Sequence, residues 1–265
     1  MYGYAYNIFK RFLGVTINPV VQAFVDANSI VDQTEINALN KMYVDLNTLV
    51  DAHGGTILYL NGISPTSYSA AKNAIIYGSG NYTMVEIGGA FTYTSNGILF
   101  SGSQCANIGT VIPNLAQERI LVCHQRYSAI SLTGISSGFS FASGTELIQL
   151  SPRPVSSNSG YNAPTNYTAY DFSGAGNWIG YNNSTTYGLW KEGTFIPPSS
   201  TTSPSASLVG THDYYIGARN INGSAGNFSG ERLSTHLIID DGGSRFSTSQ
   251  IAQISNIVSL YNLTV

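Results

Sequence analysis

The chain has 265 residues and a net charge of −3, and only 9 % of its residues are charged, against about 25 % in ordinary globular proteins. This low charge argues against a soluble helical enzyme, whose helices normally carry Glu and Lys on their outer faces. The longest basic run is the pair Lys10–Arg11. We therefore expect no nucleic-acid partner, because such binding needs a basic face that neutralises phosphates.

No stretch of about 18 apolar residues occurs, so we expect no membrane-spanning helix. Residues 1–15 do not form a clean secretory signal, because the basic pair follows the aromatic residues and no small-residue cleavage site is evident. The two cysteines, Cys105 and Cys123, form either one bridge between adjacent strands or two buried thiols, and we favour the thiols. Neither CxxC nor HxxxH is present, and we expect no metal site and no cofactor.

Residues 1–54 are expected to form a short helical segment. Asn18 can cap a helix that begins at Pro19, where the missing N–H costs nothing. Asp32 can cap a second helix, with Glu35 three residues later in a variant of the capping box. Its apolar face has spacings of three and four and consists of Ile36, Leu39, Tyr43, Leu46 and Val50. This face must be buried against the rest of the chain, another copy or a neighbouring protein.

From residue 55 onward, short apolar or alternating runs are separated by Gly, Asn and Ser. Such runs indicate antiparallel strands of a sandwich or barrel. The expected strands are Thr56–Leu60, Tyr82–Ile87, Gly97–Ser101, Arg119–His124, Gly138–Ala142, Glu146–Leu150, Tyr167–Phe172, Trp178–Tyr181, Thr186–Lys191, Asp213–Ala218 and Leu233–Ile239. A capping box at Ser247 and Gln250 starts a final amphipathic helix, which we expect to cover an open sheet edge or to seal one end of the core.

The last third of the chain carries a specific order of motifs. Tyr187–Phe195 is a predicted hairpin with its turn at Lys191–Gly193, and Asp213–Asn220 reads DYYIGARN, followed by glycines up to Gly230. This order resembles the concanavalin A-like lectin/glucanase domains, related to laminin-G domains, of phage tail and head proteins. Asp32–Leu46 is similar to the helical stretch that precedes the sandwich in those proteins, although their glycine-rich aromatic bridge is missing here.

The resemblance implies a mainly β fold: an antiparallel jelly-roll sandwich over residues 55–265, a helical segment before it and a capping helix after it. It implies a structural virion protein of a tailed bacteriophage, on the capsid surface as a head decoration or fibre, or in the tail. Residues 1–54 would bind other virion proteins and build a homo-oligomer, a trimer in the case of a fibre. The alternative is a carbohydrate-binding module for host recognition, or a glycoside hydrolase of the same fold.

The acidic residues do not form a catalytic pattern in the sequence. A retaining glycoside hydrolase needs two carboxylates about 5–5.5 Å apart, and the Glu-x-Asp-x-x-Glu pattern of that family is absent. Asp240 and Asp241 are adjacent, so on a strand they would point to opposite faces. We therefore expect no enzyme and no catalytic residues, and we expect the acids to lie at solvated strand ends and turns.

One aromatic and amide-rich cluster is a candidate sugar site. Aromatic faces stack on pyranose rings, while amides bind their hydroxyl groups. The candidate carbohydrate-binding residues are Trp178, Tyr181, Asn182, Tyr187 and Trp190. A possible partner is therefore a host-surface polysaccharide. The alternative for both tryptophans is a place in the core of adjacent strands.

Overall fold

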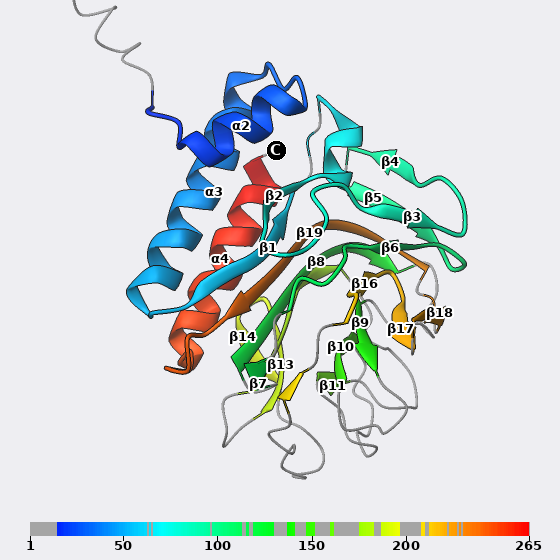
Figure 1. Cartoon of the computed structure of the whole chain (residues 1–265). Coiled ribbons are helices and arrows are strands. Elements are labelled where there is room, and N and C mark those ends of the chain that lie inside the picture. The colour runs from blue at the N-terminus through cyan, green and yellow to red at the C-terminus, as the bar shows by residue number, and fades with distance from the viewer. Residues whose placement is uncertain are drawn as a thin grey trace, which may run out of the picture.

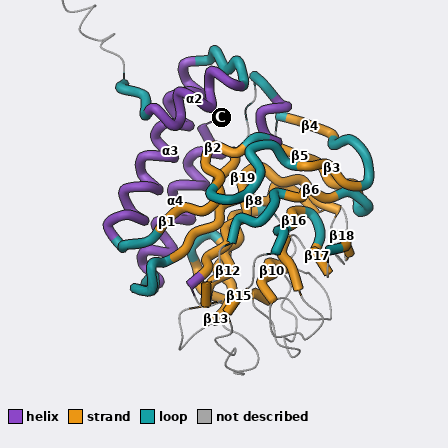
Figure 2. Tube along the Cα trace, in the orientation of Figure 1, coloured by secondary structure: helices purple, strands orange, loops and turns teal. Residues whose placement is uncertain are grey.

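The computed structural model describes residues 15–62, 64, 66–95, 97–112, 115–116, 119–129, 137–140, 147–151, 160–161, 175–182, 187–196, 208–209, 212–221, 223–226, 228 and 230–264. In this part of the chain, two largely antiparallel sheets face each other, and helices cover the outer side of the larger sheet (Figures 1 and 2). The prediction of a mainly β sandwich with a C-terminal helix is confirmed.

The described chain begins with α2 (Pro19–Ala27) and α3 (Gln33–Ala52). Both predicted caps are present: the Asn18 side chain accepts a hydrogen bond from the N–H of Val20, and Asp32 accepts one from the N–H of Glu35, each at 3.0 Å. The Glu35 side chain completes no reciprocal capping box. Its carboxylate instead accepts the Thr66 hydroxyl at 2.6 Å and ties α3 to the loop that follows the first strand.

The larger sheet has the strand order β14-β13-β12-β8-β19-β1-β2, and β5 and β4 extend it beside β19. Its strands are β1 (Thr56–Asn61), β2 (Ala74–Tyr77), β4 (Thr92–Thr94), β5 (Gly97–Ser101), β8 (Ile120–Ala129), β12 (Gly176–Asn182), β13 (Tyr187–Lys191), β14 (Thr194–Ile196) and β19 (Gly230–Asp240). The long strand β19 pairs with β1, β5 and β8, so it lies at the centre of the sheet.

The second sheet has the order β11-β10-β9-β16-β6-β3, with β17 and β18 attached to β9. Its strands are β3 (Val85–Ile87), β6 (Cys105–Asn107), β9 (Ser137–Ser140), β10 (Leu147–Ser151), β11 (Gly160–Tyr161), β16 (Tyr215–Ile216), β17 (Arg219–Ile221) and β18 (Ser224–Gly226). A short pair is formed by β7 (Leu115–Ala116) and β15 (Leu208–Val209), and a 3₁₀ helix, η1, spans Tyr68–Lys72.

Most predicted strands coincide with observed strands, but two are shorter than expected and a third is not tested. The strand expected at Tyr82–Ile87 begins only at Val85, and the one expected at Asp213–Ala218 is limited to Tyr215–Ile216. The strand expected at Tyr167–Phe172 lies outside the described residues. The second of these runs is short because Gly217, with φ +82°, turns the chain, a conformation that glycine adopts without strain.

The hairpin of β13 and β14 turns at the predicted place. Glu192 has φ 49° and Gly193 has φ 74°, as a two-residue type I′ turn requires. The Glu192 carboxylate explains why a residue other than Asn occupies this position. It accepts the N–H of Asn177 at 2.8 Å and the hydroxyl of Ser259 at 3.1 Å, so it joins the hairpin to β12 and to the final helix.

The final helix, α4, spans Thr248–Thr264 and begins with the predicted box, in which Gln250 accepts the N–H of Ser247 at 2.8 Å. Its predicted position is wrong. It lies beside α3 on the face of the larger sheet (Figure 1), and Asn177 of β12 donates to the carbonyl of Ser255 at 2.8 Å. A sheet with this many strands has a wide apolar outer face, which needs two helices to cover it.

The apolar side of α3 is buried against the rest of this chain. Leu39, Leu46 and Val50 of α3 belong to the same core cluster as Trp178 of the sheet and Ile254 of α4. Of the three expected partners for this helical face, the sandwich is therefore the one found. The attachment and oligomerisation role of residues 1–54 stays a prediction. Among the described residues, no helix combines the length and the apolar character that a membrane span requires.

Candidate functional site

The predicted aromatic sugar site is not a surface site. Trp178, Tyr181 and Trp190 have 0 %, 0 % and 1 % of their surface exposed, so no ring face is open to a saccharide. Asn182 and Tyr187 lie in β12 and β13, and their side chains fall outside the described residues. The alternative that placed the two tryptophans in the core is the one the structure supports.

Strand geometry separates these rings. Trp178 and Tyr181 are three residues apart on one strand, so they point to opposite faces of the sheet. Tyr181 lies 6.4 Å from the Trp190 ring on the side of α4, whereas the Trp178 ring faces the inside of the sandwich, with the Lys191 ammonium 5.0 Å from its centroid. The cluster is contiguous in the sequence but is divided between two layers of the core.

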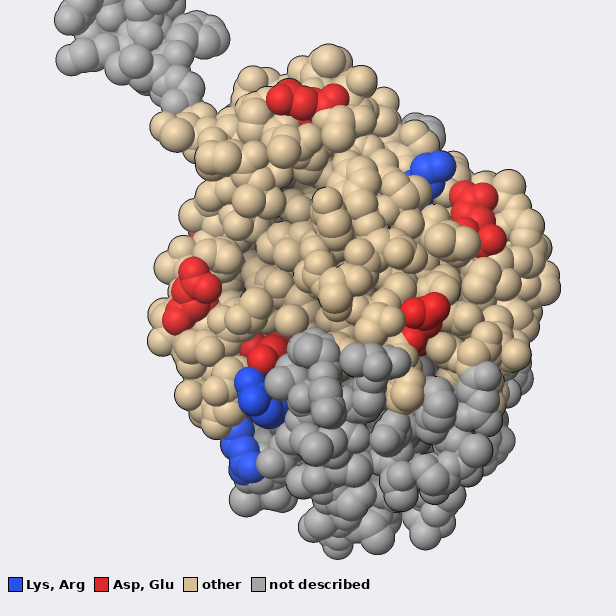
Figure 3. Space-filling model, viewed as in Figure 1, with Lys and Arg blue, Asp and Glu red and all other residues tan. Residues whose placement is uncertain are grey.

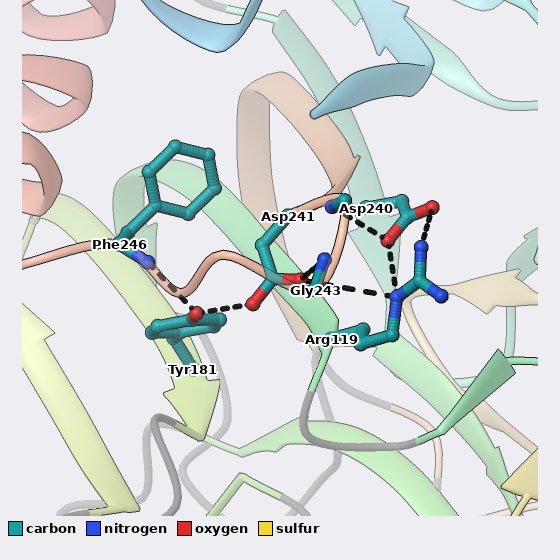
Figure 4. A network of polar contacts seen from close by, with 7 residues as sticks. Arg119, Tyr181, Asp240, Asp241, Gly243 and Phe246 are labelled. Carbon is teal, nitrogen blue, oxygen red and sulfur yellow. Dashed lines mark hydrogen bonds and ion pairs between the residues drawn. The ribbon is translucent and has the colours of Figure 1, made fainter. Parts of the chain in front are cut away.

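The adjacent acids Asp240 and Asp241 belong to a polar network at the end of β19 (Figure 4). Arg119 binds Asp240 through two parallel hydrogen bonds, with Nε 2.9 Å from Oδ1 and Nη2 2.8 Å from Oδ2. The same Nε is 3.9 Å from the Asp241 carboxylate. A bidentate guanidinium–carboxylate pair is strong and geometrically specific, and Arg119 therefore fixes the start of β8 against the end of β19.

Asp241 is completely buried, contrary to the expectation of a solvated turn. Its Oδ2 accepts the Tyr181 hydroxyl at 2.5 Å, and its Oδ1 accepts the N–H of Gly243 at 2.7 Å. The Tyr181 oxygen in turn accepts the N–H of Phe246 at 3.0 Å. Burial, followed by the nearby Asp241 carboxylate, raises the pKa of Tyr181. The phenol stays protonated, and the network ties the loop before α4 to the sheet.

Two histidines form a buried pair between the sheets. Nδ1 of His124 on β8 lies 2.9 Å from Nδ1 of His236 on β19, and the His236 ring is 5.6 Å from the ring of Tyr214. Burial lowers the pKa of His236 to about 3. The His236 ring is therefore neutral near pH 7, and one of the two Nδ1 atoms donates the proton that the other accepts. This pair is enclosed in the core and offers no access to a large substrate.

A groove on the surface, unlike the buried predicted site, presents polar side chains and an exposed aromatic ring. One of its walls is α3, where Tyr43, Asn47 and Asp51 project from the same side at spacings of four residues. The Asn47 amide donates to the Asp51 carboxylate at 2.7 Å. Burial, and secondly the Asp51 charge, raise the pKa of Tyr43. This wall therefore offers a neutral hydroxyl, an amide and a carboxylate in one row.

The opposite wall of the groove comes from β1 and β2 and is mainly apolar. It consists of Thr56, Ile57, Ile75, Ile76 and Tyr77, and Val20 of α2 closes one end. Tyr77 is 46 % exposed, at the end of an edge strand. Its ring rests on the ring of Tyr82 at 5.3 Å, which holds it in place. The groove encloses about 380 Å³, within the range of small-molecule sites.

This α3–β2 groove combines an exposed aromatic ring with hydrogen-bonding groups, and Asp51 is the one charged residue in its lining. The sequence carried a signal for one wall, since the tyrosine, the amide and the acid recur every four residues in a predicted helix. It carried none for the other wall, which depends on the pairing of β2 with β1. In the described part of the chain, no group of three or more His, Cys, Asp or Glu side chains could hold a metal ion.

The two cysteines are free and buried. Cys105 lies in the second sheet, and Cys123 lies in the larger sheet, where its thiol donates to the Asn177 side chain at 2.9 Å. Burial raises the pKa of the Cys105 thiol to about 12, and it also raises the pKa of Cys123. Of the two alternatives left by the sequence, buried thiols are observed, and both are far too weakly acidic to be reactive nucleophiles near neutral pH.

No family model matches the sequence, and no curated protein is significantly similar to it. Solved structures with a similar fold include domain 4 of AbnA, a GH43 extracellular arabinanase of Geobacillus stearothermophilus, in complex with arabinotriose, at 11 % identity and a TM-score of 0.41, covering 76 % of this chain and 87 % of that domain. Trypanosoma rangeli sialidase in complex with sialic acid follows at 9 % identity and a TM-score of 0.45, covering 85 % of this chain and 39 % of the sialidase.

The NanB sialidase of Streptococcus pneumoniae is also similar, at 11 % identity and a TM-score of 0.34, over 56 % of this chain and 27 % of the sialidase. The chain thus spans less than half the length of either sialidase. The expectation of no enzyme made from the sequence is corrected, because the solved structures similar to this chain include a domain of an arabinanase and two sialidases. At this distance, the likeness concerns the fold and assigns this chain neither a catalytic residue nor a substrate.

Proposed function

We propose that this chain is a carbohydrate-binding β-sandwich module whose binding surface is the α3–β2 groove. The observation that carries the proposal is Tyr77, an exposed ring held by Tyr82 and facing a row of polar groups on α3. An aromatic face beside convergent amide and carboxylate oxygens is the arrangement that recognises a saccharide, which has apolar C–H faces and hydroxyl edges. The glycan partner expected from the sequence is retained, at a different place in the fold.

The charge of the groove favours neutral sugars. Its lining contains Asp51 and no Lys or Arg, so an acidic sugar would meet a like charge without a compensating cation. Neutral hydroxyls can donate to the Asp51 carboxylate and accept from the Asn47 amide. The face shown in Figure 3 has few charged side chains, and its basic side chains lie in two small groups, each beside an acidic side chain, so they form no broad basic patch there.

Binding should be measured by calorimetry against neutral polysaccharides and against a sialylated glycan. Tyr77→Ala should weaken binding of the neutral glycan roughly tenfold, because removal of one central aromatic contact costs about 1.4 kcal/mol. Val85→Ala is the matched control: Val85 is 52 % exposed on β3, outside the groove, and its removal should leave the affinity unchanged. Equal affinity of Tyr77→Ala and the parent protein for every glycan bound would refute the assignment of the groove.

The virion location is retained as a second proposal. It rests on the resemblance of Asp213–Gly230 to phage head and tail sandwiches and on no feature of the groove. Mass spectrometry of purified phage particles should find the chain at a fixed copy number per particle. Its absence from intact particles would reject this location and leave the glycan-binding proposal standing.

A further inference from the structure

The outer side of α4 has no charged residues and exposes two leucines, which is unusual for a helix that faces only water. The 17 residues of α4 contain no Asp, Glu, Lys or Arg, although α4 forms part of the outside of the described molecule (Figure 1). Solvent-facing helices normally carry charge on their outer side. Leu260 and Leu263 are 55 % and 84 % exposed on this side. Depletion of charge together with exposed leucines is typical of the centre of a protein interface.

A groove runs beside these leucines, between α3 and α4. It encloses about 370 Å³, and its lining includes Lys41, Met42 and Asp45 of α3 and Ile257, Leu260 and Tyr261 of α4. The α3–α4 surface, defined as this groove with Leu263, therefore has a hollow and a projecting apolar ridge side by side. A surface with both shapes can fit a copy of itself, as an isologous contact requires.

The charges on the α3–α4 surface are also self-complementary. It contains one cation, Lys41, and one anion, Asp45, which form an i,i+4 pair with Nζ 2.5 Å from Oδ2. Lys41 is 71 % exposed and Asp45 is 38 % exposed in their side chains, so both are available to a second molecule. A two-fold axis that crosses α3 between them brings each Lys41 to Asp45 of the partner subunit.

We infer that the α3–α4 surface is the contact of a two-fold symmetric homodimer, in which the Leu260–Leu263 ridge of each copy packs into the groove of the other. The occupant is a second copy of this chain, because the patch carries one exposed cation and one exposed anion, which complement the same two charges of another copy, beside exposed leucines and a groove. The inference is independent of the proposed glycan site. Tyr43, Asn47 and Asp51 line a different groove on α3, so both glycan grooves stay open in such a dimer.

Sedimentation equilibrium over about 1–100 µM chain tests this inference, a range in which a specific dimer of micromolar affinity assembles. The parent protein should be a dimer, and the double variant Leu260→Asp with Leu263→Asp should be a monomer with an unchanged circular dichroism spectrum. Val31→Asp is the matched control, because Val31 is 85 % exposed before α3 and outside this surface, and it should remain dimeric. A monomeric or trimeric parent protein, or equal dissociation of the control, overturns the inference.

Charge reversal gives a second test, which does not depend on the leucines. Lys41→Asp alone should raise the dissociation constant of the dimer roughly fivefold, because each of two symmetric contacts becomes a like-charge pair. Lys41→Asp combined with Asp45→Lys should restore the parent value, since the opposite charges meet again. Equal dissociation constants for the parent, the single variant and the double variant would contradict the proposed axis.

Discussion

The buried histidine pair makes a quantitative prediction about acid stability. His236 of β19 is 1 % exposed, and Nε2 has no hydrogen-bond partner among the described residues. The groups that face it are His124 from β8, Tyr59 from β1 and Tyr214 from the loop before β16, none of which carries a negative charge near neutral pH. A proton on this ring would therefore place an uncompensated charge in the core.

The lowered pKa of His236 makes the folded protein less stable in acid. The pKa of His236 is about 3 in the folded protein and 6.5 in the unfolded reference, so the unfolded chain binds the proton more tightly and acid favours unfolding. The stabilisation is complete above pH 6.5 and is lost as the pH falls toward 3. Over this window the slope is about 1.4 kcal/mol per pH unit, so stability at pH 4 is about 3 kcal/mol lower than at pH 7 from this residue.

Urea unfolding at half-unit steps between pH 7 and pH 4 measures this slope directly. Other groups titrate over the same range, so the comparison is with His236→Gln, which keeps a polar side chain that does not ionise. The variant should be less stable at pH 7 but should lose about 3 kcal/mol less than the parent protein on acidification. A variant whose stability falls in parallel with that of the parent protein at every pH would show that this ring is not buried as described.

Two substitutions test the core around α4. Tyr181→Phe removes a hydroxyl that donates to the buried Asp241 and accepts from the N–H of Phe246. In urea denaturation it should lower the free energy of unfolding by about 2 kcal/mol. A change below a few tenths of a kcal/mol would contradict these hydrogen bonds. Trp190→Ala leaves a cavity in the core and should lower the free energy of unfolding by about 3–5 kcal/mol. Its glycan affinity should be unchanged at a temperature where the variant is folded. A variant that is as stable as the parent protein but no longer binds sugar would show that Trp190 contacts the glycan.

The helices were predictable because their signals are local. The caps at Asn18, Asp32 and Ser247 each depend on a side chain and a backbone N–H within three residues, and all three are observed. The position of α4 was not predictable in the same way. It depends on Asn177 of β12 and on Glu192 of the β13–β14 turn, which bind the helix from about 70 residues earlier in the chain.

The predicted aromatic cluster is buried because residues that are close in the sequence need not lie together on a surface. Trp178 and Tyr181 alternate across a sheet that is covered on both faces, so each ring enters a core. Among the described residues, Tyr77 is an exposed ring, and its polar neighbours in the α3–β2 groove come from α3, about 30 residues earlier in the chain. A single sequence does not show which strand lies beside which helix, so the α3–β2 groove became visible only with the pairing of β1 and β2.

The central place of β19 has a consequence for synthesis. This strand separates β1 from β8, and the N–H of His236 donates to the side chain of Asn61, 175 residues earlier. While the ribosome is still making the first 229 residues, the sheet lacks its middle, and β1 and β8 have no common neighbour. Pairing across such a separation is slow, and the nascent chain keeps unpaired strand edges until β19 has emerged, so the cell's chaperones should meet it often.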